Sequence, residues 1–419
     1  MASNYAGQNA KWQEKTPKIC VVTYVNDDWS FDRDLPFPIP AHLEAAVYEK
    51  FKNQPEGYDR NTTYIKSPTN PGLYNGPYSV TEFKLGSHVV LKPNPSFFGA
   101  APSIAKIVVT HISDTSALRA NLISQQVDVV SAVGFPADVA ISMSEEFEKD
   151  HLPVMVRFQN SSIFQGLFLQ MENDQLKDVR VRKALALALD KSSFTKAFFK
   201  DKIMAANTFL PPQHPAFKQR ASEFSREKAK KLLDEAGWKV SGDKGLRQKN
   251  GKNLTLQFKT SAGIKIYENL QQLLCDQFKQ IGVSCEIKNE PPRILLGDSV
   301  PKGQFDIAMF GQPILPDSSM TSSFSSKEIP SAKNSWAGGN VGRWSNTKVD
   351  ELLAQFDQEW SPSKRNQIVT KIEGIYLQER PFIPLYHRRE AMVIPRGLTG
   401  VQDDIAGTGF VFPERWQWK

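Results

Sequence analysis

The chain has 419 residues, of which 40% are hydrophobic and 23% are charged, and its formal net charge is +7. This composition is typical of folded domains and excludes extensive disorder, and the length allows two or three domains with cores of their own. Lysines and arginines are scattered along the chain, and zinc-finger, RNA-recognition and basic-zipper motifs are missing, so nucleic acid is not expected as a partner.

The N-terminal residues 1–16 are polar, and we expect them to be disordered. They contain no apolar core of a secretion signal, and no apolar run in the chain approaches the length of a membrane span. The cysteines Cys20, Cys275 and Cys285 are odd in number and give no disulfide framework or metal motif. Free and mostly buried thiols are expected.

The first third of the chain is predicted to be a mixed α/β region. Strands are expected at 18–25, at the end of the turn-rich stretch 67–83, in "HVVLKPNPSFFG" and in "IAKIVVTHI". Helices are expected at 41–51 and after Ser113 or Asp114, either of which suits an N-cap. The apolar run "VDVVSAV" is expected to form a buried strand.

A second α/β region is predicted from residue 156. It opens with the strand "SSIFQGLFLQM" and a helix capped by Asp178. A helix at 225–238 ends at Gly237, and strands at 254–258 and 283–287 flank a helix that Gly282 ends. This strand–helix–strand order predicts parallel pairing. The remaining elements are expected at 305–311, 348–359, 363–379 and 381–394. The last is a strand in which the prolines are restricted to a sheet edge or a strand end, and the aromatic tail is expected to dock on a core.

Catalytic motifs are missing from the sequence. The chain has no GxSxG elbow, P-loop or GxGxxG fingerprint, and none of its histidines has a metal-ligand spacing. The six histidines are His42, His88, His111, His151, His214 and His387. We therefore expect a protein that is not an enzyme and that has no cofactor or bound metal.

Several stretches in the same order resemble one family, the bacterial solute-binding proteins of oligopeptide and dipeptide ABC importers, or solute-binding family 5. They are "PTNPGLYNGPYSVTEFKLGSHVVLKPNPSFFG", "DVRVRKALALALDK", "TFLPPQHPAF", "AKKLLDEAGW", "GQFDIAMFGQ", "NTKVDELL" and "RPFIPLYHRREAMVI". Each motif is weak alone, but their common order between residues 60 and 400 is a specific signal.

The resemblance implies a two-lobed α/β fold of the type II periplasmic-binding-protein kind, with mixed sheets and an incomplete first lobe. Residues 1–155 would form part of lobe I, 156–394 lobe II, and 395–419 a tail returning to lobe I. Family members begin with a secretion signal and a longer N-terminal part, so the expectation is a shortened form that lacks the opening strands and a small domain. The hinge is expected near 154–162 and 385–395.

The resemblance also implies a function. Such proteins close two lobes over an extended peptide and deliver it to an ABC permease complex in the inner membrane. A periplasmic monomer is expected, although the missing signal leaves retention in the cytoplasm open. The alternatives are a shortened remnant that no longer transports, an interaction module, or a peptide hydrolase that reuses the cleft. Because one fold serves many ligands, a sugar or a chelated metal also remains open.

The site residues follow from the same resemblance. Asp317 is expected to pair with the α-ammonium group of the peptide, because a charge-assisted hydrogen bond is strong in a water-poor site; alternatively it is a turn residue after proline. Phe310, Gly311 and Gln312 are expected to offer backbone groups, although family members often have an aromatic residue where Gln312 stands. The three remaining candidates either line a side-chain pocket or belong to a surface loop: Trp336, Asn340 and Arg343.

Other charged residues are interpreted as structural. Arg180, Arg182 and Lys183 are expected to cap and solvate a helix and not to touch ligand. His387 and Arg388 lie near the proposed hinge, where a solvated strand end is favoured over contact with a carboxylate.

Overall fold

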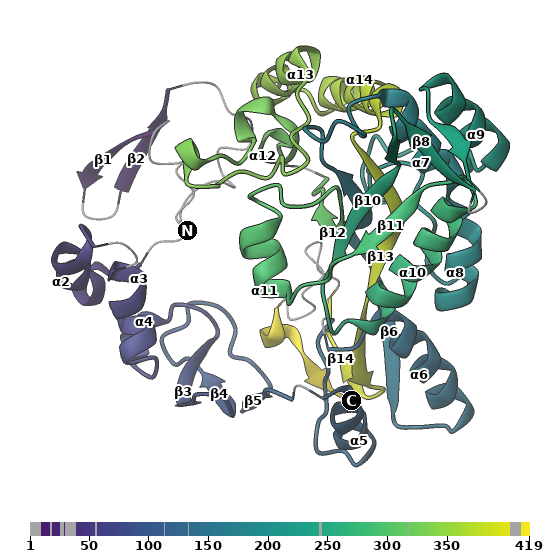
Figure 1. The fold of residues 1–419 in the computed structure, drawn as a ribbon. Coiled ribbons are helices and arrows are strands. Elements are labelled where there is room, and N and C mark those ends of the chain that lie inside the picture. The colour runs from purple at the N-terminus through teal and green to yellow at the C-terminus, as the bar shows by residue number, and fades with distance from the viewer. Residues whose placement is uncertain are drawn as a thin grey trace. The chain divides into compact units, whose positions relative to one another are not determined.

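The computed structural model describes residues 10–16, 19–25, 29, 39–54, 57–112, 114–132, 134–242, 245–316, 318–402 and 412–419 (Figure 1). The chain divides into two compact units. Unit 1 comprises Met1–Asp34 and Asn160–Arg389, and unit 2 comprises Leu35–Gln159 and Glu390–Lys419. Of the three points where the chain passes between the units, two lie inside the long strands β6 and β13, and these two fall within the segments predicted as a hinge.

Unit 1 is built on a five-stranded mixed sheet with the order β11-β10-β12-β6-β13. The strands are β11 (Ser284–Ile287), β10 (Thr255–Thr260), β12 (Ile307–Pro313), β6 (Val154–Leu169) and β13 (Phe382–Pro395). β10 is parallel to both β11 and β12, and β12 is antiparallel to β6. The predicted parallel pairing and the edge position of β13 are therefore confirmed.

The helices of unit 1 occupy the predicted segments, with one exception. They are α7 (Val179–Ala188), α8 (Lys191–Phe199), α9 (Arg226–Glu235), α10 (Lys265–Lys279), α13 (Thr347–Gln358) and α14 (Pro362–Glu379). The exception is α8, which follows α7 as a separate helix that was not predicted. Helix α10 buries Leu270, Leu274 and Phe278 from one face, as its 3.6-residue spacing predicts. Figure 1 shows α8 and α10 side by side along the sheet.

Shorter elements complete unit 1. They are the hairpin β1 (Ala10–Thr16) and β2 (Ile19–Tyr24), the small sheet β7 (Lys239–Ser241), β8 (Leu246–Lys249) and β9 (Lys252–Asn253), and the turns α11 (Pro292–Ile294), η2 (Leu295–Ser299), α12 (Thr321–Phe324), η3 (Ser326–Glu328) and η4 (Ala332–Asn334). Gly237 and Gly282 follow α9 and α10 with φ of +87° and +84°, a conformation that glycine adopts at helix ends.

The basic segment at the start of α7 has two different environments. Asp178 caps the helix, as predicted, by accepting a hydrogen bond from the backbone N–H of Arg180, and it also pairs with the exposed Arg180 side chain. Arg182, however, is buried: Nε donates to Glu379 O, and Nη1 donates to Leu176 O and Lys177 O, each at 2.8 Å. The expectation of a solvated charge is wrong for Arg182, because its guanidinium satisfies carbonyls that would otherwise be buried without a donor.

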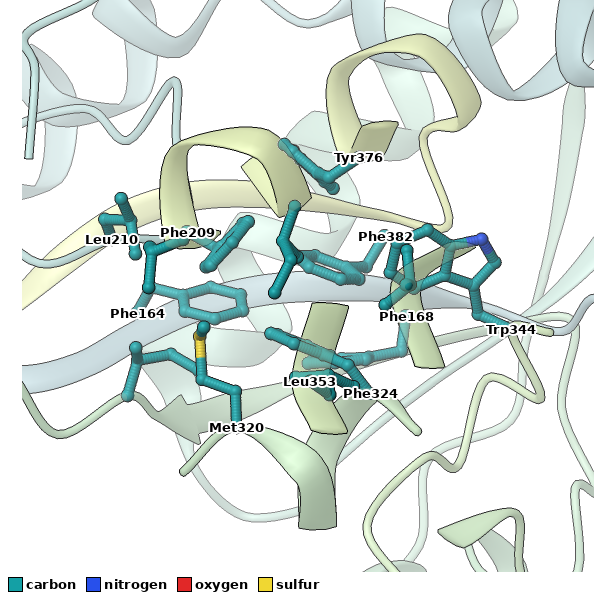
Figure 2. Close-up of a cluster of buried hydrophobic side chains, with 14 of the residues drawn as sticks. Phe164, Phe168, Phe209, Leu210, Met320, Phe324, Trp344, Leu353, Tyr376 and Phe382 are labelled. Atoms are coloured by element: carbon teal, nitrogen blue, oxygen red, sulfur yellow. The ribbon is translucent and has the colours of Figure 1, made fainter. Parts of the chain in front are cut away.

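The main core of unit 1 is a cluster of aromatic rings (Figure 2). Phe382 of β13 lies at its centre, with ring centroids 5.6 Å from Phe164, 5.7 Å from Phe168 and 4.7 Å from Tyr376. Phe209 and Phe324 contact the same ring edge-on and stacked, respectively. These rings come from two strands, helices α12 and α14 and one loop, so the cluster fixes those elements on the sheet.

Unit 2 contains smaller elements. Its helices are α2 (Ala41–Phe51), α3 (Gly57–Asn61), α4 (Thr63–Lys66), α5 (Thr115–Ile123) and α6 (Ala137–Lys149), with 3-10 turns η1 (Pro71–Leu73) and η5 (Pro413–Arg415). A three-stranded antiparallel sheet consists of β3 (Tyr78–Lys84), β4 (His88–Pro93) and β5 (Ile107–Thr110), and β14 (Leu398–Thr399) pairs with β15 (Gln417–Trp418). Asp114 caps α5, and Trp416 is buried in a small core with Leu398, which confirms that the tail docks.

Three local predictions were wrong. Residues Ala10–Thr16, predicted as disordered, form β1, because β2 supplies the partner for its ladder. The run "VDVVSAV" is not a strand: among its described residues only Val130 forms an isolated bridge, to Val393, and its apolar side chains enter a core without a ladder. Cys20 is exposed, because the β1–β2 hairpin has little cover, whereas Cys275 and Cys285 are partly buried; all three thiols are free, as predicted.

No helix in the described part of the chain is long and apolar enough to cross a membrane.

Candidate functional site

The two parallel strands β10 and β12 separate at their carboxyl ends. Their pairing stops at Thr260 and Met309. After Thr260 the chain leaves β12 and pairs with the segment that follows β11. There Ser261 forms an isolated β-bridge with Glu290, and the Ala262 N–H donates to Glu290 O at 2.8 Å. β12 continues to Pro313 along β6 alone. In open α/β sheets, ligands bind outside the carboxyl ends of the parallel strands.

The register between β12 and β6 shows which backbone groups face this opening. Ile314 N–H donates to Ser162 O of β6 at 2.8 Å, one step beyond the pair Pro313–Ile163. In an antiparallel ladder the hydrogen-bonded pairs alternate, so Gly311, paired with Gln165, does not bond to β6. Its N–H and C=O point to the side that β10 has left, and no backbone partner for them occurs within the described part of the chain.

Phe310 and Gln312, on either side of Gly311, do not present their backbone groups to this opening. By the same alternation, the backbone groups of Phe310 and Gln312 point to β6. The Phe310 ring stacks on Phe168, with 4.1 Å between centroids, which joins this edge to the aromatic core. The Gln312 side chain donates from Nε2 to Ser323 Oγ at 3.0 Å and so links β12 to α12. Among these three consecutive residues, the geometry leaves only Gly311 with backbone groups for a ligand.

An ion pair supports the β10 side of the opening. Lys259 is buried, and its Nζ lies 2.6 Å from Glu290 Oε1. Hydrogen bonds from Lys259 and Ser299 outweigh the desolvation of the Glu290 carboxyl and lower its pKa, so this side chain is ionised at neutral pH. The pair fixes the turn that carries α11 away from β12. Sequence reasoning missed this pair, because a single Lys and a single Glu that lie 31 residues apart in the chain form no motif.

The predicted side-chain candidates lie elsewhere. Asp317 is outside the described residues. Trp336 is partly buried and has a φ of +61° in the loop after α12. Asn340 is buried, and its Nδ2 lies within 3.3 Å of the carbonyl oxygens of Phe324, Ser325 and Trp344 while its Oδ1 accepts from Trp344 N–H. Its amide therefore organises the loop that presents Trp336.

Arg343 lies at the other end of β12. Its neighbour Gly342 accepts from Met171 N–H just after β6 ends, next to the start of β12. Arg343 Nε is 3.1 Å from Glu172 Oε2, and Nη2 lies near the carbonyls of Pro301 and Pro330. The structure therefore brings Gly311 and Gln312 together but separates them from Arg343 by the length of β12.

A polar cavity of about 400 Å³ lies at this far end. It is lined by Gln170, Glu172, Asn173, Gln257, Glu286, Gly303, Phe305 and Asp306. Its central carboxylate, Asp306, already accepts hydrogen bonds from Asn173 Nδ2 at 2.5 Å and from Gln257 N–H at 2.7 Å. Because these groups satisfy one another, we place the functional site at the split carboxyl ends and not here.

Two buried bases lie near the unit 1 end of β13. Burial, and then the positive charge of Lys191, lowers the pKa of His387 to about 4, so the imidazole is neutral at pH 7. Burial, and then the charge of Arg380, lowers the pKa of Lys191 to about 7, and its Nζ donates to Ala206 O at 2.6 Å. A solvated strand end is therefore wrong for His387. Within the described residues, no three His, Cys, Asp or Glu side chains are grouped to hold a metal ion.

Comparison of this sequence with known proteins identifies the family to which the chain belongs. The model of the "Bacterial extracellular solute-binding proteins, family 5 Middle" matches residues 22–330. The oligopeptide-binding protein AppA of Bacillus subtilis is 26% identical over 341 residues, 78% of this chain and 58% of that protein. The oligopeptide-binding protein OppA of Lactococcus lactis is 26% identical over 237 residues, 54% and 39% of the two chains. This chain thus spans less than two thirds of the length of these relatives.

Solved structures show the same fold. The AppA structure from B. subtilis, in complex with a nonapeptide, has a TM-score of 0.81 at 20% identity and covers 100% of this chain and 80% of its own. NikZ from Campylobacter jejuni, in complex with Ni(L-His), has a TM-score of 0.81 at 23% identity, with coverages of 99% and 80%. The predicted two-lobed type II fold is confirmed. The chain belongs to the bacterial extracellular solute-binding proteins of family 5.

Proposed function

We propose that this protein captures extended oligopeptides outside the bacterial cytoplasm and delivers them to the membrane permease of an ABC importer. It acts as a binding component, performs no chemistry on its ligand, needs no cofactor, and works as a monomer. The relatives named oligopeptide-binding proteins support this proposal.

The observation that carries the proposal is the free backbone of Gly311. An extended peptide can add to the side of β12 that β10 has left, pairing its main chain with the Gly311 N–H and C=O. Main-chain pairing makes affinity largely independent of the peptide sequence. Glycine at this point leaves room for a ligand backbone to approach closely.

Two side chains complete the proposed site. Asp317, shortly after β12, pairs with the α-ammonium group of the peptide, and Trp336 contributes to a pocket for a peptide side chain. Asn340 takes part by holding the Trp336 loop through its carbonyl contacts. Gln312 fixes the end of β12 through Ser323.

The test measures binding directly. The purified chain is examined by native mass spectrometry for co-purified peptides and then titrated in a calorimeter with a synthetic pentapeptide, its N-acetylated form, and Ni(L-His). We expect peptide adducts, binding of the free-amine peptide, and at least about tenfold weaker binding of the acetylated peptide. Asp317→Asn should remove that difference, whereas Asp174→Asn, a fully accessible carboxylate at the far end of the sheet, should not. Binding of Ni(L-His) without any peptide binding would contradict the proposal.

A further inference from the structure

Two of the three cysteines, Cys275 of α10 and Cys285 of β11, lie on either side of the turn that joins this helix to this strand. Phe278 O accepts hydrogen bonds from the backbone N–H groups of Ile281 and Val283, at 3.0 and 3.1 Å, so the chain reverses directly from α10 into β11. Cys275 precedes Phe278 by a helical rise of about 4.5 Å, and Cys285 follows Val283 by about 6.6 Å of strand. The two cysteines therefore lie at similar distances from the same turn.

Their side chains meet between the helix and the sheet. Cys275 follows Gln271 by four residues on the same face of α10, and the Gln271 side chain reaches the sheet, because its Nε2 donates to Phe258 O of β10 at 3.0 Å. Cys285 pairs with the fully buried Leu256 of β10, so these two side chains share one face of the sheet. A hydrogen bond joins the thiols of Cys275 and Cys285.

The surroundings of the two thiols suit an exchange reaction with a reagent from solution. Both cysteines are free and only partly buried, so a small molecule can reach them. The hydrogen bond with Cys285, and then burial, raise the pKa of the Cys275 thiol, which is therefore protonated at neutral pH. No third His, Cys, Asp or Glu side chain in the described part of the chain joins the pair as a ligand set for a metal ion.

We propose that Cys275 and Cys285 are a redox pair that closes to an intramolecular disulfide by exchange with an external disulfide. Because Cys275 stays protonated, the Cys285 thiolate attacks first, forms a mixed disulfide and expels one thiolate of the oxidant. Cys275 then loses its proton and attacks the Cys285 sulfur, which expels the second thiolate. One S–S bond has formed and one has broken, the protein has lost two protons and two electrons, and the oxidant has become two thiols.

The disulfide fastens the edge of the unit 1 sheet. β11 is the outermost strand of that sheet and has β10 as its neighbour. A covalent link from β11 to α10 restricts the unfolded chain and so raises the midpoint of unfolding. Proteins outside the cytoplasm meet oxidising conditions in which such a bond persists. That location belongs to the proposed function, whereas the pairing of the thiols depends only on the geometry of unit 1.

The experiment identifies the linked cysteines by mass. Trypsin cuts after Lys265, Lys279 and Lys288, which places Cys275 and Cys285 on the separate peptides 266–279 and 280–288. The folded wild-type chain is incubated with oxidised glutathione, its remaining thiols are alkylated, and the digest is analysed without reduction. We expect the two peptides to be joined, with a mass two hydrogen atoms below their sum.

The exposed Cys20 and two serine variants provide the controls. Cys20 is expected to stop at the mixed disulfide with glutathione. Cys275→Ser and Cys285→Ser should each leave the other cysteine of the pair as a glutathione adduct. In a Cys20→Ser background, oxidation should raise the thermal midpoint by about 2 °C or more, and dithiothreitol should reverse this rise. Neither serine variant of the pair should show the rise.

Separate glutathione adducts on Cys275 and Cys285, without a linked peptide, would overturn the proposal. The same holds if both thiols of the folded chain resist the oxidant, or if the linked chain has a lower thermal midpoint than the reduced one, since the bond would then require a distorted fold.

Discussion

Unit 1 and unit 2 bury their sheets very differently. In unit 1, strands β6 and β13 carry three of the rings labelled in Figure 2, and Leu353 of α13 and Tyr376 of α14 belong to the same buried cluster. In unit 2, the sheet β3-β4-β5 exposes apolar side chains to solvent. One cross-strand row consists of Phe83, Val89 and Val109, of which Phe83 is 45% and Val109 48% exposed. Phe98, in the turn after β4, is 93% exposed.

The difference in buried apolar contacts predicts how stability is distributed between the two units. Local opening is governed by buried apolar contacts, so unit 1 should be the stable part of the molecule and the β3-β4-β5 sheet the labile one. The proposed ligand contact, Gly311, lies on β12, a strand of the stable sheet. A binding site on rigid strands keeps its geometry between ligands.

The largest effect should come from the centre of the unit 1 core. Phe382→Ala removes a ring that contacts five other aromatic residues and should lower the free energy of unfolding by about 3–5 kcal/mol. Phe98→Ala, an equal truncation at an exposed position in unit 2, should change it by less than about 1 kcal/mol. Urea denaturation measures both, and equal losses would refute the difference between the units.

Acid should weaken unit 1 through His387. Its folded pKa of about 4 lies below the ordinary 6.5, so the unfolded chain binds a proton that the folded chain does not between these values. Stability therefore falls as pH drops from 6.5 to 4, by about 3 kcal/mol in total. The free energy of unfolding should depend less on pH across this range in His387→Leu than in the wild type, and an equal dependence in both proteins would contradict this role of His387.

A smaller effect is expected from a buried ion pair of unit 1. Arg220 Nη2 lies 2.7 Å from Glu373 Oε2, and the Glu373 side chain is only 1% exposed. Arg220→Met leaves that carboxylate without its partner and should cost about 2 kcal/mol in the free energy of unfolding. Arg180→Met breaks the exposed pair with Asp178 and should cost clearly less than Arg220→Met, because water and salt screen this pair. Similar costs for the two variants would mean that burial does not decide the strength of these pairs.

The smallest effect concerns the exposed face of unit 2. Val109→Thr should change the free energy of unfolding by about 0.5 kcal/mol or less, because the side chain already lies half in water. The same change should reduce binding of a hydrophobic dye to the native protein. A loss of stability like that of a core residue would show that this face is covered in solution.

Local patterns predicted the fold well and the site only in part. Alternation, helical spacing and terminal glycines located α2, α10, β12 and α14, because each of these signals acts over a few residues. The same signals could not place β1, whose strand depends on its partner, or the burial of Arg182, which depends on carbonyls at Leu176 and Glu379.

The site depends even more on distant contacts. The resemblance to the family indicated Phe310, Gly311 and Gln312, but only the register with β6 singles out Gly311. Gln165 of β6 and Arg388 of β13 both lie near Gly311 of β12, although each is more than 70 residues from Gly311 along the chain. No local pattern in the sequence indicates that these three strands converge at one point.

The most direct measurement follows the Gly311 amide while peptide is added. Labelling phenylalanine with ¹³C at the carbonyl and glycine with ¹⁵N selects only Phe–Gly pairs, and the chain has two, at Gly99 and Gly311. The account predicts that a saturating peptide shifts the Gly311 signal and slows exchange of its amide proton at least about tenfold, since the amide gains a hydrogen bond. Gly99, in unit 2, serves as the internal reference. A peptide that binds but leaves the Gly311 amide unchanged would contradict the central claim that the ligand pairs with the free edge of β12.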